Sequence, residues 1–140
     1  MTQAIRSGVL ALALALAAWV PTTALAAVDL IEWKDVAAVT GSGKPATAEE
    51  IRRAFMVGGA RRGWTFTEAG PDKMIFTVLV RTHTLVMELT YGPGKYSLTY
   101  KDSTNLDFRD EAGKRTIHRN YVNWNNNLMN DARAELMRLC

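Results

Sequence analysis

Apolar and polar residues alternate with a period of two through the middle of the chain, from Trp64 to Lys101. Such alternation is typical of strands that bury one face and expose the other. Three turns interrupt the pattern, two of them rich in glycine and proline and the third a polar threonine-histidine pair. The pattern therefore predicts four strands, at residues 64–69, 73–81, 84–91 and 95–102.

If consecutive strands pair as an antiparallel meander, one choice of turns places the apolar side chains of all four strands on the same face. A two-residue loop at residues 82–83 pairs Val80 with Leu85. The glycine-proline loop between the last two strands pairs Tyr91 with Tyr96. The predicted core face is Trp64, Phe66, Phe76, Val78, Val80, Leu85, Met87, Leu89, Tyr91, Leu98 and Tyr100.

The opposite face of the meander is mostly polar, as expected for an antiparallel sheet with one solvated side. Ile75, Leu79 and Val86 form an apolar island on it. Scattered surface hydrophobes are the ordinary interpretation of such a group. A homodimer that forms through this face is the alternative.

Segments whose apolar residues have helical spacing lie on both sides of the alternating segment. Before it, Thr47 is followed three residues later by Glu50, which has the form of a capping box, and a helix is predicted over 47–62. After it, apolar residues four apart predict a helix over 121–139. The predicted fold class is therefore α+β, a four-stranded antiparallel meander with two helices packed on one face, in a single domain at residues 47–140.

The first 26 residues have the pattern of a cleaved export signal. Arg6 precedes an apolar run over residues 9–20, and Ala24-Leu25-Ala26 supplies the small side chains that signal peptidase requires. The run is shorter than the roughly 20 residues that span a membrane. We expect cleavage near Ala26 and a periplasmic or secreted chain with no transmembrane segment. Residues 27–46 are predicted to form an N-terminal extension with a short strand and a linker.

Charge and cysteine content narrow the range of partners. The chain has 17 Lys and Arg against 14 Asp and Glu, a formal charge of +3 at pH 7. This balance is not that of a polyanion binder, and we expect no nucleic-acid partner. The single cysteine is the last residue, Cys140, so no internal disulfide is expected. A terminal thiol and an intermolecular disulfide both stay open as its role.

Residue types that carry catalytic or metal chemistry are sparse. The two histidines, His83 and His118, lack the spacing of zinc ligands, and no nucleophile elbow surrounds Ser103. The acidic residues at 29–35 and 107–111 are interpreted as solvated loop carboxylates. We expect no metal, no cofactor and no catalytic residue. The alternative is a small periplasmic enzyme, hydrolase-like, that uses His118 or His83 as its base.

Polar side chains concentrate at strand ends and at the start of the second helix. The N–H groups of that helix, with Arg119, would favour an anionic group. The other interpretation is capping, in which His118 or Asn120 ends the loop and Ser103 and Asn105 satisfy a turn. The candidate ligand-binding or partner-binding residues are Arg81, His83, Ser103, Asn105, His118, Arg119 and Tyr121.

Several short motifs also form a recognisable string over about residues 48–128. They are Arg62-Gly63-Trp64, Arg81-Thr82-His83, Ser103-Thr104-Asn105-Leu106 and Ile117-His118-Arg119-Asn120-Tyr121. The string resembles a family of small exported bacterial proteins, many of them lipoproteins, that has no assigned activity. The resemblance implies a location in the cell envelope, although this chain lacks the lipobox cysteine that would tether it to a membrane.

Together these features predict an exported, non-enzymatic binding or accessory protein of the cell envelope. Its expected partner is an envelope protein or a small anionic or polar ligand.

Overall fold

A computed structural model describes residues 27–140, and the predicted export signal lies outside the described residues. In chain order the elements are β1 (Ala27–Asp29), β2 (Trp33–Ala37), α1 (Ala48–Arg61), β3 (Thr65–Glu68), β4 (Lys73–Val80), β5 (His83–Gly92), β6 (Lys95–Thr104), β7 (Arg109–Glu111), β8 (Lys114–His118) and α2 (Asn120–Met137). Neither of the helices in this part of the chain has the length and hydrophobicity needed to cross a membrane.

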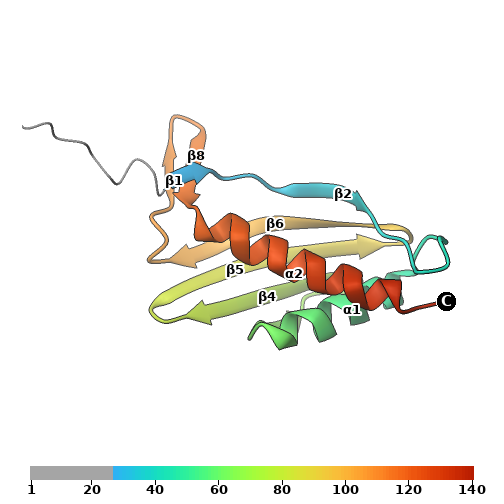
Figure 1. Ribbon diagram of the computed structural model, residues 1–140. Coiled ribbons are helices and arrows are strands. Elements are labelled where there is room, and N and C mark those ends of the chain that lie inside the picture. Colours follow the sequence, from blue (N-terminus) through green and yellow to red (C-terminus); the bar gives the residue numbers. More distant parts are fainter. Residues whose placement is uncertain (1–26) are drawn as a thin grey trace, which may run out of the picture.

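The strands form two antiparallel sheets, not one four-stranded meander (Figure 1). The predicted meander is present as β3 to β6, but β2 adds a fifth strand, in the order β2-β6-β5-β4-β3. A second sheet has the order β1-β8-β7. The α+β class is therefore confirmed and the four-strand architecture is wrong, because segments on both sides of the meander supply further strands.

A bulge explains why β2 has only a weak strand pattern. Trp33 pairs with Leu98 and Val36 pairs with Tyr96, so the register shifts between them. Asp35, with a φ of 51°, lies within this irregularity. Trp33 and Val36 both pack against the core although they are three positions apart, which breaks the period of two. The segment predicted as an extension, residues 27–46, thus contributes a strand to each sheet.

The β4–β5 hairpin turns one residue earlier than predicted. Val80 pairs with His83 instead of Leu85, so the loop is Arg81-Thr82. Arg81 takes a φ of 58°, as the first loop residue of a tight two-residue hairpin does. Each partner moves by two positions, so every side chain keeps its predicted face.

The predicted core face is buried over most of its length. Tyr91 pairs with Tyr96 as predicted, and Tyr96 and Met74 join the core. Phe66 is the exception, with 38% of its surface exposed, because β3 is the outer strand of the sheet. The confirmed core residues are Trp64, Phe76, Val78, Leu85, Met87, Leu89, Tyr91 and Leu98, while Val80 and Tyr100 are half-buried.

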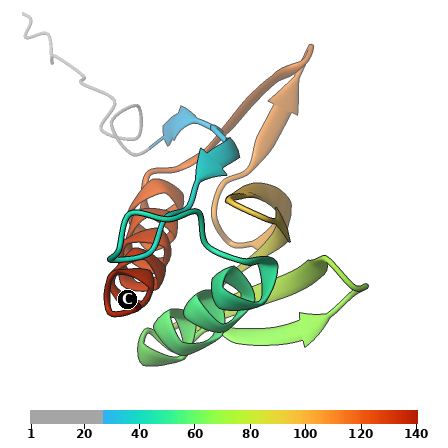
Figure 2. The same cartoon turned by 90° about the vertical axis from the view of Figure 1, so that its right-hand side faces the viewer.

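Both helices cover the same face of the five-stranded sheet (Figure 2). α1 begins at the predicted capping box: Thr47 Oγ1 accepts from the Glu50 N–H at 3.1 Å, and the Glu50 carboxylate accepts from the Thr47 N–H at 2.9 Å. These two bonds satisfy N–H groups that the first helical turn cannot.

A close contact between the helices, which we call the helix seam, involves Gly58, Arg61 and Arg62 of α1 and Asp131, Ala132 and Glu135 of α2. A Cβ atom at Gly58 would lie 2.8 Å from the backbone nitrogen of Ala132, so only glycine fits there without a shift. Arg62 Nε lies 2.7 Å from Asp131 Oδ2. Arg61 and Glu135 form a second ion pair between the two helices.

Candidate functional site

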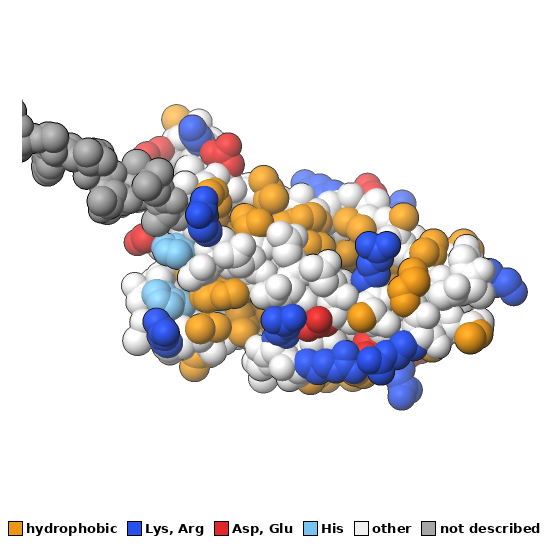
Figure 3. All heavy atoms as spheres, in the orientation of Figure 1, with side chains coloured by type: hydrophobic (Ala, Val, Ile, Leu, Met, Phe, Trp, Pro, Cys, Tyr) orange, Lys and Arg blue, Asp and Glu red, His pale blue; other side chains and the backbone are white. Residues whose placement is uncertain are grey.

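The predicted binding residues gather at one end of the molecule, where the β4–β5 hairpin, the ends of β6 and β8 and the start of α2 lie (Figure 1). The two histidines, pale blue in Figure 3, mark this end. We call it the polar end, and it contains Arg81, His83, Ser103, Asn105, His118, Arg119 and Tyr121. Five of these seven residues form at least one side-chain hydrogen bond within the fold.

His83 and Asn105 attach the β4–β5 hairpin to the end of β6. His83 Nδ1 lies 2.6 Å from the Asn105 carbonyl oxygen, so Nδ1 donates, and Nε2 is an acceptor when the ring is neutral. Asn105, with a φ of 62°, donates through Nδ2 to Thr82 Oγ1 at 2.8 Å. The His83 ring centroid lies 6.4 Å from that of Trp124. His83 is thus oriented, with one ring nitrogen still available.

His118 caps the first turn of α2. Its Nδ1 accepts from the Asn120 N–H at 3.0 Å, and the Val122 N–H donates to the Arg119 carbonyl oxygen at 3.0 Å. The capping interpretation is confirmed for His118, and two N–H groups of the expected anion site already have protein acceptors. The Arg119 and Arg81 side chains are exposed and have no hydrogen-bond or ion-pair partner within residues 27–140.

Tyr121 and Ser103 are also bonded internally. Tyr121 is fully buried, and its hydroxyl donates to the Ile31 carbonyl oxygen at 2.6 Å. Burial, together with the charge of Glu32, raises the pKa of Tyr121 well above its ordinary value. Ser103 Oγ lies 2.7 Å from the Tyr100 hydroxyl. Both hydroxyls hold segments of this fold together.

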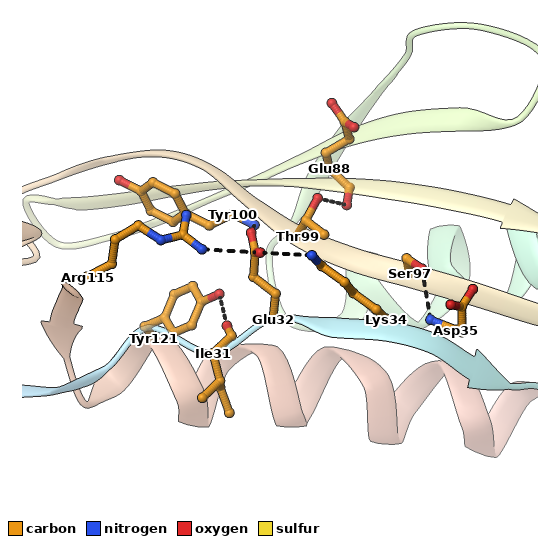
Figure 4. A network of polar contacts seen from close by, with 10 residues as sticks. All are labelled: Ile31, Glu32, Lys34, Asp35, Glu88, Ser97, Thr99, Tyr100, Arg115 and Tyr121. Carbon is orange, nitrogen blue, oxygen red and sulfur yellow. Dashed lines mark hydrogen bonds and ion pairs between the residues drawn. The ribbon is translucent and has the colours of Figure 1, made fainter. Parts of the chain in front are cut away.

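Glu32 is a structural carboxylate, and its interpretation as a solvated acid is wrong. Its side chain is 14% exposed and lies 3.2 Å from Arg115. It also accepts from the backbone N–H of Tyr100 at 2.9 Å. Figure 4 shows this carboxylate between the segment that leads into β2, strand β6 and strand β8. Glu32 therefore ties the two sheets together.

An apolar groove of about 360 Å³ lies between β2 and α2. Phe55 and Tyr96, whose ring centroids are 4.8 Å apart, line its base. Trp33 of β2 and Met129 of α2 lie on its two sides. Figure 3 shows apolar side chains, in orange, along the boundary between β2 and α2. The volume falls within the range of about 300–1,000 Å³ that is typical of small-molecule sites.

The polar side chains of the groove can all donate hydrogen bonds, and none of them has a partner among residues 27–140. Asn126, Asn130 and Arg133 follow each other at helical spacing along α2 and line the groove. Within the described part of the chain their side chains form no hydrogen bond or ion pair, and neither does the Tyr96 hydroxyl. Burial raises the pKa of Tyr96 to about 12, against the opposing charge of Arg133, so this hydroxyl is a donor at neutral pH.

The sequence patterns do not reveal the groove, although one signal for it exists. Asn126, Asn130 and Arg133 share a stripe of α2 beside the buried stripe that contains Leu128 and Ala132. A polar stripe next to an apolar one marks a helix edge, where a cleft can form. The opposite side of the groove has no such signal, because it depends on the pairing of β2 with β6.

Comparison with known proteins gives no relative for this chain. No family model matches it, and no curated protein or solved structure matches it either. The resemblance to small exported bacterial proteins therefore stays a prediction. Among residues 27–140, no group of three or more His, Cys, Asp or Glu side chains is placed to hold a metal ion.

Proposed function

We propose that this chain is an exported binding protein of the cell envelope that holds a small molecule in the groove between β2 and α2. The groove itself supports the proposal, because a mostly apolar space with a small number of placed polar groups is typical of a ligand site. Within residues 27–140 its lining includes Tyr96, Asn126, Asn130 and Arg133 but no histidine, serine, cysteine or carboxylate. Such a lining suits recognition better than bond cleavage.

Export is the part of this proposal that rests on the first 26 residues. The apolar run over residues 9–20 and the small side chains of Ala24 and Ala26 support it. The intact mass of the protein from a periplasmic fraction tests this directly. We expect a chain that begins at Ala27. A full-length chain confined to the cytoplasm would contradict export.

Binding in the groove is tested by native mass spectrometry of the protein isolated from its own host. We expect one small molecule per chain in the wild type and its loss in Met137→Glu, which places a charge at the exposed apolar end of the groove, where Met137 is 43% exposed. Leu79→Glu is the matched control, because Leu79 is 66% exposed and lies on the opposite face of the sheet.

Equal occupancy in both variants, or bare protein in every preparation, would overturn the groove as the binding site. The same Leu79→Glu variant tests the homodimer alternative. A dimer that it disrupts would assign the exposed sheet face to self-association.

A hydrolase-like enzyme is the second candidate function, and the geometry of His83 favours it. The bond from Nδ1 to the Asn105 carbonyl oxygen leaves Nε2 as a base at the polar end. Ester hydrolysis by the wild-type protein that His83→Gln abolishes and His118→Gln retains would establish this function. Equal activity of wild type and His83→Gln would end it.

A further inference from the structure

Arg133 differs from the arginines of the helix seam. Arg61 and Arg62 pair with Glu135 and Asp131. Arg133 lies between these two acids in the sequence of α2, yet it lines the groove on the other side of the helix. No carboxylate within residues 27–140 lies within ion-pair distance of its guanidinium. The groove thus presents a cation whose counter-charge the described chain does not supply.

The remaining polar groups of the groove also favour an anionic ligand. The protonated Tyr96 hydroxyl can donate one hydrogen bond, the amides of Asn126 and Asn130 can donate more, and a guanidinium has five N–H groups in a planar fork. The described residues of the lining include no carboxylate, so they offer a cationic ligand no charge partner. Charge-assisted hydrogen bonds to an anion are the strongest that such a set can form.

The apolar part of the groove determines the size and character of the uncharged part of the ligand. Trp33 and Met129 at the sides offer aromatic and thioether surface over the buried ring of Phe55, and Val39 and Met137 leave apolar side chains exposed at 41% and 43%. About 360 Å³ corresponds to about a dozen water molecules in liquid volume. That space suits one unbranched chain with a similar number of heavy atoms.

We propose that the groove binds a single-chain amphipathic anion, a fatty carboxylate, with its chain on Trp33 and Met129 and its head group on Arg133. This inference rests on the proposed function, because it names the ligand class of the same groove. The two asparagine amides supply further donors to the carboxylate. A free fatty acid and the acyl part of an anionic phospholipid share this chemistry, and the single-chain volume favours the free acid.

Calorimetric titration of the purified, delipidated protein with dodecanoate and with dodecanol tests the proposal. The two probes have the same chain and differ in charge. We expect dodecanoate to bind at least tenfold more tightly than dodecanol in the wild type, and Arg133→Gln to bring the ratio of the two affinities close to one. Arg53→Gln is the control, because it removes the same charge from an exposed position on α1 that does not line this groove.

The outcomes separate this inference from the proposed function. Equal affinity for both probes would overturn recognition of an anion and leave binding in the groove intact. Binding to vesicles of phosphatidylglycerol without binding of dodecanoate would replace the single-chain ligand by a membrane lipid. Protein that binds neither probe but carries another small molecule after isolation would overturn the ligand class alone. Protein that binds neither and is isolated bare would remove both proposals.

Discussion

Helix α2 has a closed side and an open side. Toward α1, the helix seam brings the two backbones together at Gly58, and Arg62 lies 2.7 Å from Asp131. Toward β2, Asn130 and Arg133 line the groove and have no partner among the described residues. The same helix therefore pairs Asp131 and Glu135 with arginines where it packs on α1, and within residues 27–140 it leaves Asn130 and Arg133 without a partner where it borders the groove.

This contrast separates groups that hold the fold from groups available to a ligand. Seam residues contribute through close packing and ion pairs, so their loss is expected to lower the free energy of unfolding. The polar groove residues Asn126, Asn130 and Arg133 form no hydrogen bond or ion pair within the described chain, so their loss is expected to change affinity and leave stability nearly constant. Four substitutions test the separation.

Gly58→Ala carries the largest expected cost to stability. Its Cβ would meet the backbone nitrogen of Ala132 at 2.8 Å, and forced overpacking costs about 1–3 kcal/mol. Urea unfolding measures the change. Gly92→Ala is the control, since a Cβ at Gly92 would have no heavy atom within 4 Å. If the two variants are equally stable, the helix seam is not tightly packed.

Tyr96→Phe tests whether solvent reaches the Tyr96 hydroxyl at the base of the groove. The pKa of Tyr96 rises from 10.0 to about 12, so between these values the unfolded chain loses a proton that the folded chain keeps. The contribution of Tyr96 is therefore present below pH 10 and lost as the pH rises to 12.

The stability of the wild type relative to Tyr96→Phe should then fall by up to about 2 kcal/mol over this interval. Urea unfolding at pH 9, 10, 11 and 12 measures it, and ultraviolet titration of the phenol gives the pKa directly. A constant difference between the two proteins would mean that solvent reaches the Tyr96 hydroxyl and that the base of the groove is wet.

Arg62→Gln has a smaller expected effect. The pair with Asp131 is partly exposed, with 48% and 21% of the two side chains accessible, and such ion pairs contribute about 0–1 kcal/mol. We expect a loss in that range that shrinks as salt is added, because ions screen the pair. A loss well above it, unaffected by salt, would show that Arg62 acts through packing.

Asn130→Ala is expected to raise the free energy of unfolding by about 0.5 kcal/mol, since alanine is the better helix former and Asn130 has no partner in the described chain. Its ligand affinity should fall. Chemical unfolding without ligand gives the first quantity and dodecanoate titration the second. Reduced stability in this variant would place Asn130 among the structural residues and break the comparison.

Local sequence patterns predict the parts of this fold that local chemistry determines. The capping box at Thr47 and Glu50 forms as predicted, and the pairing of Tyr91 with Tyr96 follows from its short loop. The alternation of the meander assigns core positions correctly up to the edge strand. There Phe66 is exposed, because burial at an edge depends on what covers it.

Non-local pairing accounts for what the patterns miss. β2 has an irregular pattern because of the bulge at Asp35, and its partner β6 lies far along the chain. The shift in the β4–β5 hairpin is invisible to alternation, since moving by two residues preserves both faces. Glu32 gives no sign in the sequence that Arg115 will cover it.

The two candidate sites also differ in how far the sequence predicts them. The residues of the polar end follow from strand and helix boundaries, which local patterns locate well. The groove requires β2 and α2 to face each other, and that arrangement follows only from the assembled sheet. Chemistry that depends on two distant segments is therefore the part that sequence patterns fail to predict.

The N-terminal segment also affects how an exported chain of this topology would fold. The segment that contains Ile31 would emerge first. The Tyr121 hydroxyl, which donates to the Ile31 carbonyl oxygen, follows 90 residues later. β1 and β2 would likewise wait for β8 and β6, and such long-range closure is slow. Until then Trp33 and Val36 would stay exposed. The newly translocated chain would thus pass through an interval in which chaperones protect it or proteases remove it.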